Sequence, residues 1–198
     1  MLKLYNKLLK RYGKQGWWPL WSSRLNKFEY NSINPKNFNQ KLEICLGAIL
    51  TQNTNWKNAE KALMNLIKNN LINVKKLDKI KENKLALLIK SSGYYRQKAR
   101  KIKEFVKFLI SKKEINRENL LSVWGIGRET ADSILLYAYN KPFFVVDNYT
   151  KKLFSNLNYC KKDISYDELQ ELIIKKIPKE VNVYKEFHSL IIAYGKTV

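Results

Sequence analysis

The sequence predicts an all-α protein whose helices form two lobes. Apolar residues recur at the three- and four-residue spacing of a helix along most of the 198-residue chain, and strict two-residue alternation is rare. Pro35 and Pro142 bracket the central helical patterns, and proline suits a connection better than a helix interior. We therefore expect a central lobe of six helices at 36–141 and a second helical lobe formed by 1–35 plus 142–198. A single undivided bundle fits the pattern nearly as well.

The individual elements follow from the same periodicity. The first helix is expected over 2–12, where the apolar residues form a single stripe. A loop rich in glycine, proline and tryptophan follows it. The sequence FFVVD at 143–147 is compatible with an extended segment that is too short to found a sheet. The other helical patterns lie at 38–50, 56–69, 83–90, 96–110, 118–123, 129–140, 148–157, 166–176 and 181–194.

The charge of the chain indicates a polyanionic partner. Lysine and arginine number 38 against 17 aspartate and glutamate, which gives a formal net charge of +21. A field of that sign favours nucleic acid, although compositional bias with a solvated basic surface would also produce it. No run approaches the roughly 18 apolar residues of a membrane span, and the start of the chain lacks the pattern of a signal peptide. We expect a cytoplasmic protein without a membrane partner, associated with the nucleoid in a prokaryote.

Residues that commonly bind metals are few. Cys45 lies in an apolar run, Cys160 is far from it in the sequence, and no C-x-x-C pair occurs. The single histidine, His188, excludes a multi-histidine site, and we expect it to serve packing or hydrogen bonding near the end of a helix. We therefore predict no metal site.

Two glycines form a corner between a short and a longer helical pattern, in the sequence VWGIGRETA. Gly125 and Gly127 permit positive φ and the close approach of another backbone, and Ile126 between them can point into the core. The amides of the corner and of the next helical turn can then donate to a phosphate, with Arg128 beside them and Thr130 one turn further. An ordinary αα-hairpin would also use such glycines.

These motifs resemble those of the endonuclease III superfamily of DNA glycosylases. VWGIGRETA is similar to its helix-hairpin-helix motif, and FFVVDNYTKKLF to the loop and aspartate that follow. The stretches LGAILTQNTNWKNAEKAL, SSGYYRQKARKIKEF and FHSLIIAYGK resemble other helices, so the resemblance covers nearly the whole chain. YGKQGWWP is typical of the endonuclease-III-related 3-methyladenine glycosylase III-like branch. The resemblance implies an endonuclease III-like fold with an active-site cleft between two helical lobes.

Asp147 is the candidate catalytic residue. It precedes the helical pattern NYTKKLF, so its carboxylate is expected to cap that helix and to be held ionised by the helix N-terminus. From the spacing alone, helix capping could equally well be the only role of Asp147. The resemblance implies catalysis, because an ionised carboxylate can stabilise positive charge on the sugar and orient or deprotonate water.

Glu129 bears on the type of reaction. It lies eighteen positions before Asp147 (147 − 129 = 18), where the resemblance implies a nucleophilic lysine in bifunctional members. A glutamate cannot form the Schiff base that leads to strand cleavage. Alternatively, Glu129 is an ordinary acidic residue in the first turn of a helix, where the helix dipole favours negative charge. We predict a monofunctional enzyme that leaves an abasic site.

The resemblance also implies a base pocket lined by Trp17, Trp18 and Pro19 together with Glu129. A base must leave the duplex to be processed, and an N-alkylated purine carries positive charge that attracts the face of an indole. Packing between lobes is an alternative role for at least one of the tryptophans.

DNA contacts are expected from the glycine corner and from two further segments. The resemblance implies that Gln52 fills the space left by the extruded nucleotide, although a polar turn residue has the same appearance in the sequence. A run of basic residues offers phosphate contacts, or alternatively forms a solvated helix face: Lys98, Arg100, Lys101 and Lys103. The expected contacts of the corner itself are Gly125, Ile126, Gly127, Arg128 and Thr130.

Together these features predict a monofunctional DNA glycosylase that flips out and hydrolytically removes a damaged base, such as 3-methyladenine, in base excision repair. Its partner would be double-stranded DNA with a damaged base, bound by a monomer. Many relatives hold an iron–sulfur cluster through four cysteines, which this sequence lacks, so we expect no cofactor. The alternatives are a non-catalytic helix-hairpin-helix DNA-binding module, or a bifunctional glycosylase and abasic-site lyase that acts on oxidised pyrimidines.

Overall fold

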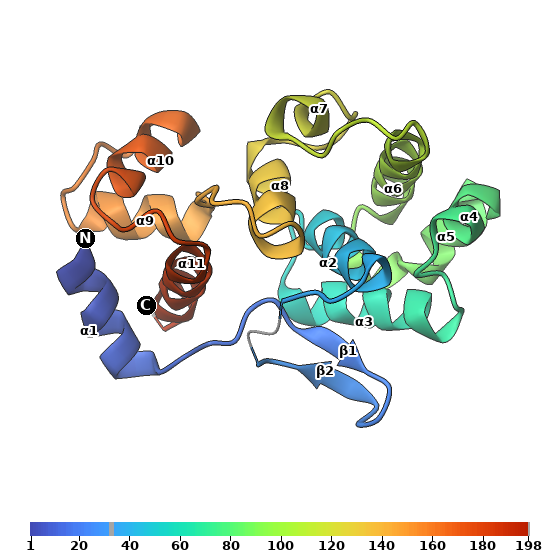
Figure 1. The fold of residues 1–198 in the computed structure, drawn as a ribbon, viewed down its shortest axis with the longest axis horizontal. Coiled ribbons are helices and arrows are strands. Elements are labelled where there is room, and N and C mark those ends of the chain that lie inside the picture. Colours follow the sequence, from blue (N-terminus) through green and yellow to red (C-terminus); the bar gives the residue numbers. More distant parts are fainter. Residues whose placement is uncertain (32–33, 198) are drawn as a thin grey trace. The chain divides into compact units, whose positions relative to one another are not determined.

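The regular secondary structure of the protein is almost entirely helical, as the sequence predicted (Figure 1). The computed structural model describes residues 1–31 and 34–197. In chain order the elements are α1 (Leu2–Tyr12), β1 (Leu20–Ser22), β2 (Lys27–Glu29), α2 (Phe38–Leu50), α3 (Trp56–Lys68), α4 (Val74–Lys79), α5 (Glu82–Leu88), η1 (Lys90–Ser92), α6 (Tyr95–Ile110), α7 (Arg117–Leu121), α8 (Arg128–Ser133), η2 (Ile134–Ala138), α9 (Asn148–Asn156), α10 (Tyr166–Ile174) and α11 (Val181–Gly195).

The chain forms two compact units. One consists of Met1–Asn34 with Leu135–Val198, and the other of Pro35–Ile134. We call these the terminal unit and the central unit. The chain enters the central unit at a proline, but it leaves it within continuous helix, where the π-helical turn η2 follows α8 without a break.

Asparagine side chains begin several helices of the central unit. Each accepts a hydrogen bond from the backbone amide three residues further on, which satisfies one of the amides left free at a helix start. The asparagines that cap α2, α3, α4 and α7 in this way are Asn37, Asn55, Asn73 and Asn116. The abundance of asparagine in the sequence thus contributes directly to the helix boundaries.

Helix α2 forms the middle of the central unit. Its residues from Leu42 to Leu50 are all buried, and it contacts α3, α6 and α8. A helix that is buried around its whole circumference is typical of the centre of a helical domain. The loop after α2 is therefore held close to α6 and α8, which carry the basic run and the second half of the glycine corner.

The terminal unit is built around α11, which packs against α1 and α9. Its core is aromatic: the Phe187 ring contacts the rings of Tyr5, Phe144 and Phe154, at centroid distances of 5.7, 5.8 and 6.4 Å. Edge and tilted contacts of this kind are favoured by aromatic quadrupoles. The two ends of the sequence are thus joined through ring packing.

A short hairpin was not expected from the sequence. Strands β1 and β2 pair antiparallel, with Trp21 opposite Phe28, in a region that we had read as loop. The two rings meet edge-on at 5.3 Å, and such cross-strand aromatic pairs stabilise a ladder. The pairing compensates for strands of only three residues each.

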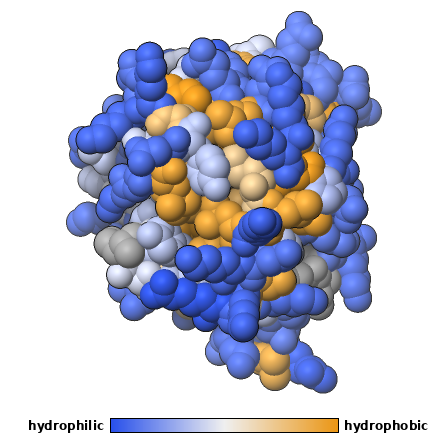
Figure 2. All heavy atoms as spheres, turned by 90° about the vertical axis from the view of Figure 1, so that its left-hand side faces the viewer, coloured by the Kyte–Doolittle hydropathy of each residue, from blue (hydrophilic) through white to orange (hydrophobic). Residues whose placement is uncertain are grey.

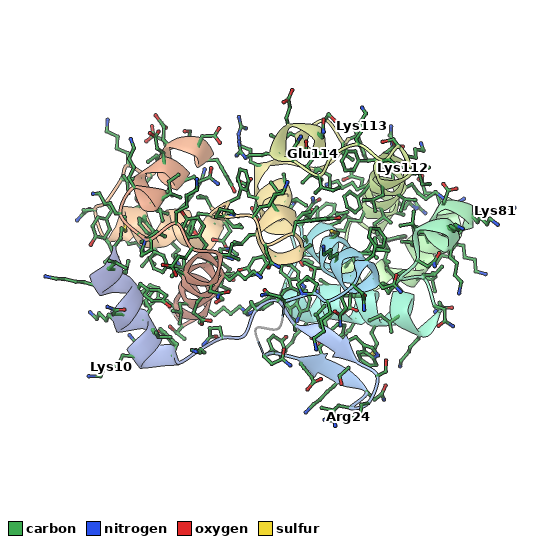
Figure 3. All side chains as sticks on the ribbon, viewed as in Figure 1. Lys10, Arg24, Lys81, Lys112, Lys113 and Glu114 are labelled. Atoms are coloured by element: carbon green, nitrogen blue, oxygen red, sulfur yellow. The ribbon has the colours of Figure 1, made fainter. Side chains whose placement is uncertain are left out.

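The surface is strongly basic but not uniformly polar. Figure 3 shows Lys10, Arg24, Lys81, Lys112 and Lys113 extending outward from the ribbon, and all five are exposed. Figure 2 shows the side that carries α1, α9 and α10, where apolar side chains gather among hydrophilic ones. The exposed large apolar residues of these elements and the turn after α9 include Leu2, Tyr149, Leu157, Tyr159 and Ile174. No described helix is both long and apolar enough to cross a membrane.

Candidate active site

Asp147 is the N-cap of α9, in the terminal unit. Its Oδ1 accepts hydrogen bonds from the Thr150 backbone amide at 2.7 Å and from the Thr150 hydroxyl at 2.8 Å. Thr150 is fully buried, so the surrounding side chains hold its hydroxyl in place against Asp147. The cap expected from the sequence is present, and it uses only one of the two carboxylate oxygens.

The other oxygen of Asp147 faces His188 on α11. His188 Nε2 lies 3.6 Å from Asp147 Oδ2, and both side chains are mostly enclosed, with exposed fractions of 8% and 13%. On the opposite edge of the imidazole, Nδ1 lies 2.7 Å from the Tyr137 hydroxyl of η2. The order Asp147, His188, Tyr137 therefore runs from a partly accessible carboxylate into the core of the terminal unit.

The environment of Asp147 favours its ionised form. Burial alone would raise the pKa of the carboxyl group, but His188 and the hydrogen bonds from Thr150 outweigh burial and lower the pKa below its ordinary value. Burial raises the pKa of the Tyr137 phenol well above its ordinary value, with further contributions from the charges of Asp147 and Glu186. Near neutral pH the site thus holds a carboxylate on one side of His188 and a protonated phenol on the other.

The predicted tryptophans lie in the same unit as Asp147. Trp18 and Pro19 are buried, and the Trp18 ring meets the Tyr137 ring at 5.3 Å. Trp17 is only partly buried and contacts the rings of Trp18 and Tyr30 edge-on, at 5.4 and 5.7 Å. Of the two rings, Trp17 therefore offers more surface to a ligand, whereas Trp18 connects the cluster to Tyr137.

The glycine corner lies between α7 and α8 in the central unit. Gly125 has a φ of +83°, in the region that favours glycine, whereas Gly127 has a φ of −92° and is extended. We expected both glycines to serve unusual backbone geometry, and this expectation is wrong for Gly127, which sits at the N-cap of α8. Ile126 is buried, as expected, while Arg128 and Glu129 are exposed at the start of α8.

Gln52 braces the corner from the loop after α2. Its Nε2 donates to the Gly125 carbonyl at 3.1 Å and to the Thr130 hydroxyl at 2.8 Å, and its Oε1 accepts a hydrogen bond from Lys101. Thr130 is buried. The structure thus brings together four of the residues expected to contact DNA, namely Gln52, Gly125, Thr130 and Lys101, all within the central unit.

The basic residues of α6 do not all have the same role. Lys98 is buried and donates to the carbonyls of Leu50 and Ser92 at 2.7 and 2.6 Å, so the expectation of a phosphate contact is wrong for Lys98. Lys103 donates to three backbone carbonyls near the end of α4. Arg100 lies over the half-exposed Trp124 ring at 4.2 Å from its centroid. Lysines that satisfy helix-end carbonyls cannot be told from solvated lysines in the sequence.

Two site residues were not recognised in the sequence. We assigned His188 to packing or hydrogen bonding and gave Tyr137 no role. They are 51 positions apart, and no local pattern joins them to each other or to Asp147. The one available signal was that His188 is the only histidine of the chain.

The described residues contain no cluster of three or more histidine, cysteine or acidic side chains that could hold a metal ion. The two cysteines lie in different units. Cys45 is buried in α2, where burial raises the pKa of its thiol, and Cys160 is partly exposed. They do not form the set of four thiolates that a four-iron cluster requires.

Known proteins match this chain over most of its length. The model of the HhH-GPD superfamily base excision DNA repair proteins matches residues 46–179. A Methanocaldococcus jannaschii protein named as a candidate DNA repair glycosylase is 40% identical, over 98% of this chain and 86% of its own length. Endonuclease III of Thermotoga maritima is 28% identical, over 83% of this chain and 78% of its own length. The crystal structure of H. pylori 3-methyladenine DNA glycosylase bound to 1,N6-ethenoadenine aligns with a TM-score of 0.78 and 32% identity, over 99% of this chain and 95% of that chain.

Proposed function

Because the chain belongs to the HhH-GPD superfamily of base excision DNA repair proteins and is a DNA N-glycosylase, we propose that it is a monofunctional enzyme for N-alkylated purines such as 3-methyladenine. The superfamily and the endonuclease III-like fold expected from the sequence are confirmed by these matches. The choice of alkylated purines is supported by the similarity to a 3-methyladenine glycosylase and by the aromatic cluster that Tyr137 and His188 connect to Asp147.

The observation that carries the proposal is the continuous contact from Trp18 through Tyr137 and His188 to Asp147. It holds an ionised carboxylate and an indole cluster within one compact unit. 3-Methyladenine in DNA is cationic, so an indole face attracts it, and the carboxylate stabilises the charge that appears on the sugar. Both requirements of the reaction are therefore met by residues of the terminal unit that are linked through Tyr137 and His188.

The reaction needs little acid catalysis. In an N-alkylated purine the base already carries positive charge, so it takes the electron pair of the breaking C1′–N bond and leaves as a neutral molecule. Water then forms the bond to C1′, and its proton passes to the carboxylate of Asp147. A single carboxylate with one oxygen outside the helix cap is sufficient for this sequence of steps.

The exposed Glu129 supports a monofunctional reaction. Glutamate cannot attack the sugar to form an imine, and its position in the first turn of α8 suits an acid. Borohydride should therefore trap no covalent adduct between the wild-type enzyme and DNA. Glu129→Lys is the matched variant. A trapped adduct with this variant alone would show that the wild-type enzyme lacks only the lysine side chain needed for imine formation. A borohydride-trapped adduct with the wild-type protein would overturn the monofunctional assignment.

The glycine corner would hold the DNA backbone. Gly127, Arg128 and Glu129 are exposed, and the amides at the start of α8 are suited to a phosphate oxygen. Gln52, which already donates to Gly125 and Thr130, would keep the corner in this shape. We propose that the enzyme binds as a monomer, because one corner and one carboxylate serve one lesion.

The decisive experiment compares the wild-type enzyme with Asp147→Asn on a panel of duplexes. Each duplex carries one lesion: 3-methyladenine, ethenoadenine, uracil or an oxidised pyrimidine. We expect release of 3-methyladenine by the wild type and a loss of about 10³-fold or more in Asp147→Asn, with unchanged binding to an abasic-site analogue. Equal turnover by Asp147→Asn would contradict the assignment of Asp147, and preferential release of oxidised pyrimidines would contradict the substrate class.

We propose that catalysis requires no iron–sulfur cluster. The two cysteines of the chain cannot supply the four ligands that such a cluster takes. Base release should therefore persist after prolonged treatment with a chelator, and the purified protein should contain no stoichiometric iron. Loss of activity on chelation, with recovery on adding iron, would refute this part of the proposal.

A further inference from the structure

The two oxygens of Asp147 have different surroundings. Oδ1 accepts both hydrogen bonds from Thr150, whereas Oδ2 has His188 Nε2 as its polar neighbour at 3.6 Å. His188 Nε2 is buried and has no hydrogen-bond partner among the described residues. A buried ring nitrogen without a partner is costly, so its placement next to a carboxylate oxygen requires an explanation.

The two neighbours of the imidazole indicate which of its nitrogens carries the proton in the neutral ring. A lone pair on Nε2 would face a carboxylate oxygen and be repelled by it, so the proton belongs on Nε2. In a neutral imidazole Nδ1 is then an acceptor, which makes the Tyr137 hydroxyl the donor in the 2.7 Å contact. The same hydroxyl can also donate to the Lys185 carbonyl at 3.3 Å, and we place its one proton in the shorter contact, with His188 Nδ1. Tyr137 thus selects the imidazole form that points an N–H at Asp147.

The other titratable groups nearby form hydrogen bonds with residues other than Asp147. Lys185 donates to the side chains of Asn34 and Asn140, at 2.9 and 2.6 Å. Glu186 accepts a hydrogen bond from the Gln15 backbone amide at 2.7 Å. The Tyr166 hydroxyl of α10 accepts from the Val146 amide at 3.3 Å. Within the described part of the terminal unit, His188 is therefore the titratable group that faces Oδ2.

We infer that His188, itself oriented by Tyr137, is a positioning residue that fixes the direction and the negative charge of the Asp147 carboxylate. The inference rests on the proposed function, because it assigns His188 and Tyr137 to the carboxylate used there. The contact of 3.6 Å is longer than a hydrogen bond. Catalytic contacts of this kind often shorten when the substrate is bound. Thr150 then holds one oxygen and His188 directs the other, so the carboxylate does not have to reorient as charge develops.

The kinetic test uses His188→Ala, the conservative His188→Gln and Tyr137→Phe, with duplex DNA that contains 3-methyladenine. Single-turnover release should fall on the order of 10²-fold in His188→Ala, as expected for a misdirected reactive group, and His188→Gln should recover part of it. The acid limb of the pH–rate profile should move to higher pH in His188→Ala, because the histidine lowers the pKa of Asp147. Binding to an abasic-site analogue should not change. An unshifted acid limb with an unchanged rate would overturn the inference.

The second test does not depend on activity or on the fold of a histidine variant. His188 is the only histidine, so imidazole-labelled protein gives one pair of ring-nitrogen NMR signals. We expect Asp147→Asn to move the Nε2 signal and Tyr137→Phe to move the Nδ1 signal. If neither signal moves, His188 does not contact these groups and the inference fails, even when Asp147→Asn abolishes base release. If both signals move while Asp147→Asn still releases the base, the contact stands and the proposed function fails.

Discussion

The helix cap and the reactive group share one side chain at position 147. Because Oδ1 belongs to the cap and Oδ2 does not, a substitution can separate the two roles. Asparagine keeps a carbonyl oxygen that can accept from Thr150, and it is among the best N-cap residues. Alanine keeps neither the cap nor the charge.

Asp147→Asn should therefore leave the free energy of unfolding within about 0.5 kcal/mol of wild type, whereas Asp147→Ala should lower it by about 1 kcal/mol. Both substitutions should abolish base release. Urea unfolding and single-turnover assays on the same preparations measure the two effects. Equal stability of the two variants would show that the cap contributes nothing.

Lys98 illustrates how much of a side chain's role depends on burial. Its ammonium group is enclosed and donates to two carbonyls, and burial, with a smaller effect of Lys101, lowers its pKa from 10.5 to about 8. The folded state thus loses this proton at lower pH than the unfolded state. Between these two pKa values the unfolded state binds more protons, so stability rises with pH.

Replacing Lys98 by methionine should remove this contribution. We expect the stability difference between wild type and Lys98→Met to shift in favour of wild type by about 1–3 kcal/mol between pH 7 and pH 10.5. Chemical denaturation at several pH values measures it. Lys81→Met, at an exposed position, is the control and should follow the wild-type curve. A pH-independent difference for Lys98→Met would mean that Lys98 titrates normally.

The sequence allowed the cap at Asp147 to be predicted but not the contact with His188. A cap joins a side chain to an amide three residues away, so the spacing reveals it. His188 lies 41 residues beyond Asp147 (188 − 147 = 41), on a helix whose position depends on the packing of α11 against α9. Tertiary packing decides such contacts, and one sequence carries no record of them.

Among the elements, the glycine corner distinguishes two residues that look equivalent in the sequence. A Cβ on Gly125 would overlap the Lys101 side chain, and its φ of +83° is strained for other residues. A Cβ on Gly127 would meet nothing within 4 Å, and its backbone is extended. Only the first glycine is required by the shape of the corner.

Gly125→Ala should lower the free energy of unfolding by about 1–3 kcal/mol, whereas Gly127→Ala should stay within about 0.5 kcal/mol of wild type. Thermal or urea unfolding of the matched pair tests this. If Gly127→Ala proves the more damaging of the two, the corner does not have the described geometry.

The long periodic helices could be predicted, whereas two short elements, α4 and the β1–β2 hairpin, could not. The pattern at 38–50 corresponds to α2, because a helix of that length has many residues to reveal its period. Helix α4 was missed, since it has six residues and buries only Leu77. The β1–β2 hairpin was missed because its stability comes from pairing between Trp21 and Phe28.

At the scale of the whole molecule, the net charge of +21 should control how tightly undamaged DNA is bound. Release of counterions from DNA makes the affinity fall steeply with salt. Exposed lysines such as Lys81 and Lys112 contribute to this attraction without reading any base. The attraction would bring the enzyme to DNA before a lesion is recognised.

The affinity for an undamaged duplex should therefore drop by about 10³-fold or more between 50 and 200 mM salt. Asp147→Asn should give the same slope on a log–log plot, because Asp147 contacts no phosphate in the proposed mechanism. Fluorescence anisotropy titrations at several salt concentrations measure both slopes. An affinity that is insensitive to salt would exclude a binding mode dominated by phosphate contacts.

The unequal exposure of the two cysteines has a practical consequence. Cys45 is enclosed within α2, whereas Cys160 is partly accessible after α9. A maleimide dye added to the native enzyme should accordingly attach at one position, far along the sequence from the glycine corner. Single-molecule fluorescence could then follow individual enzymes as they scan a stretched DNA, with no engineered labelling site.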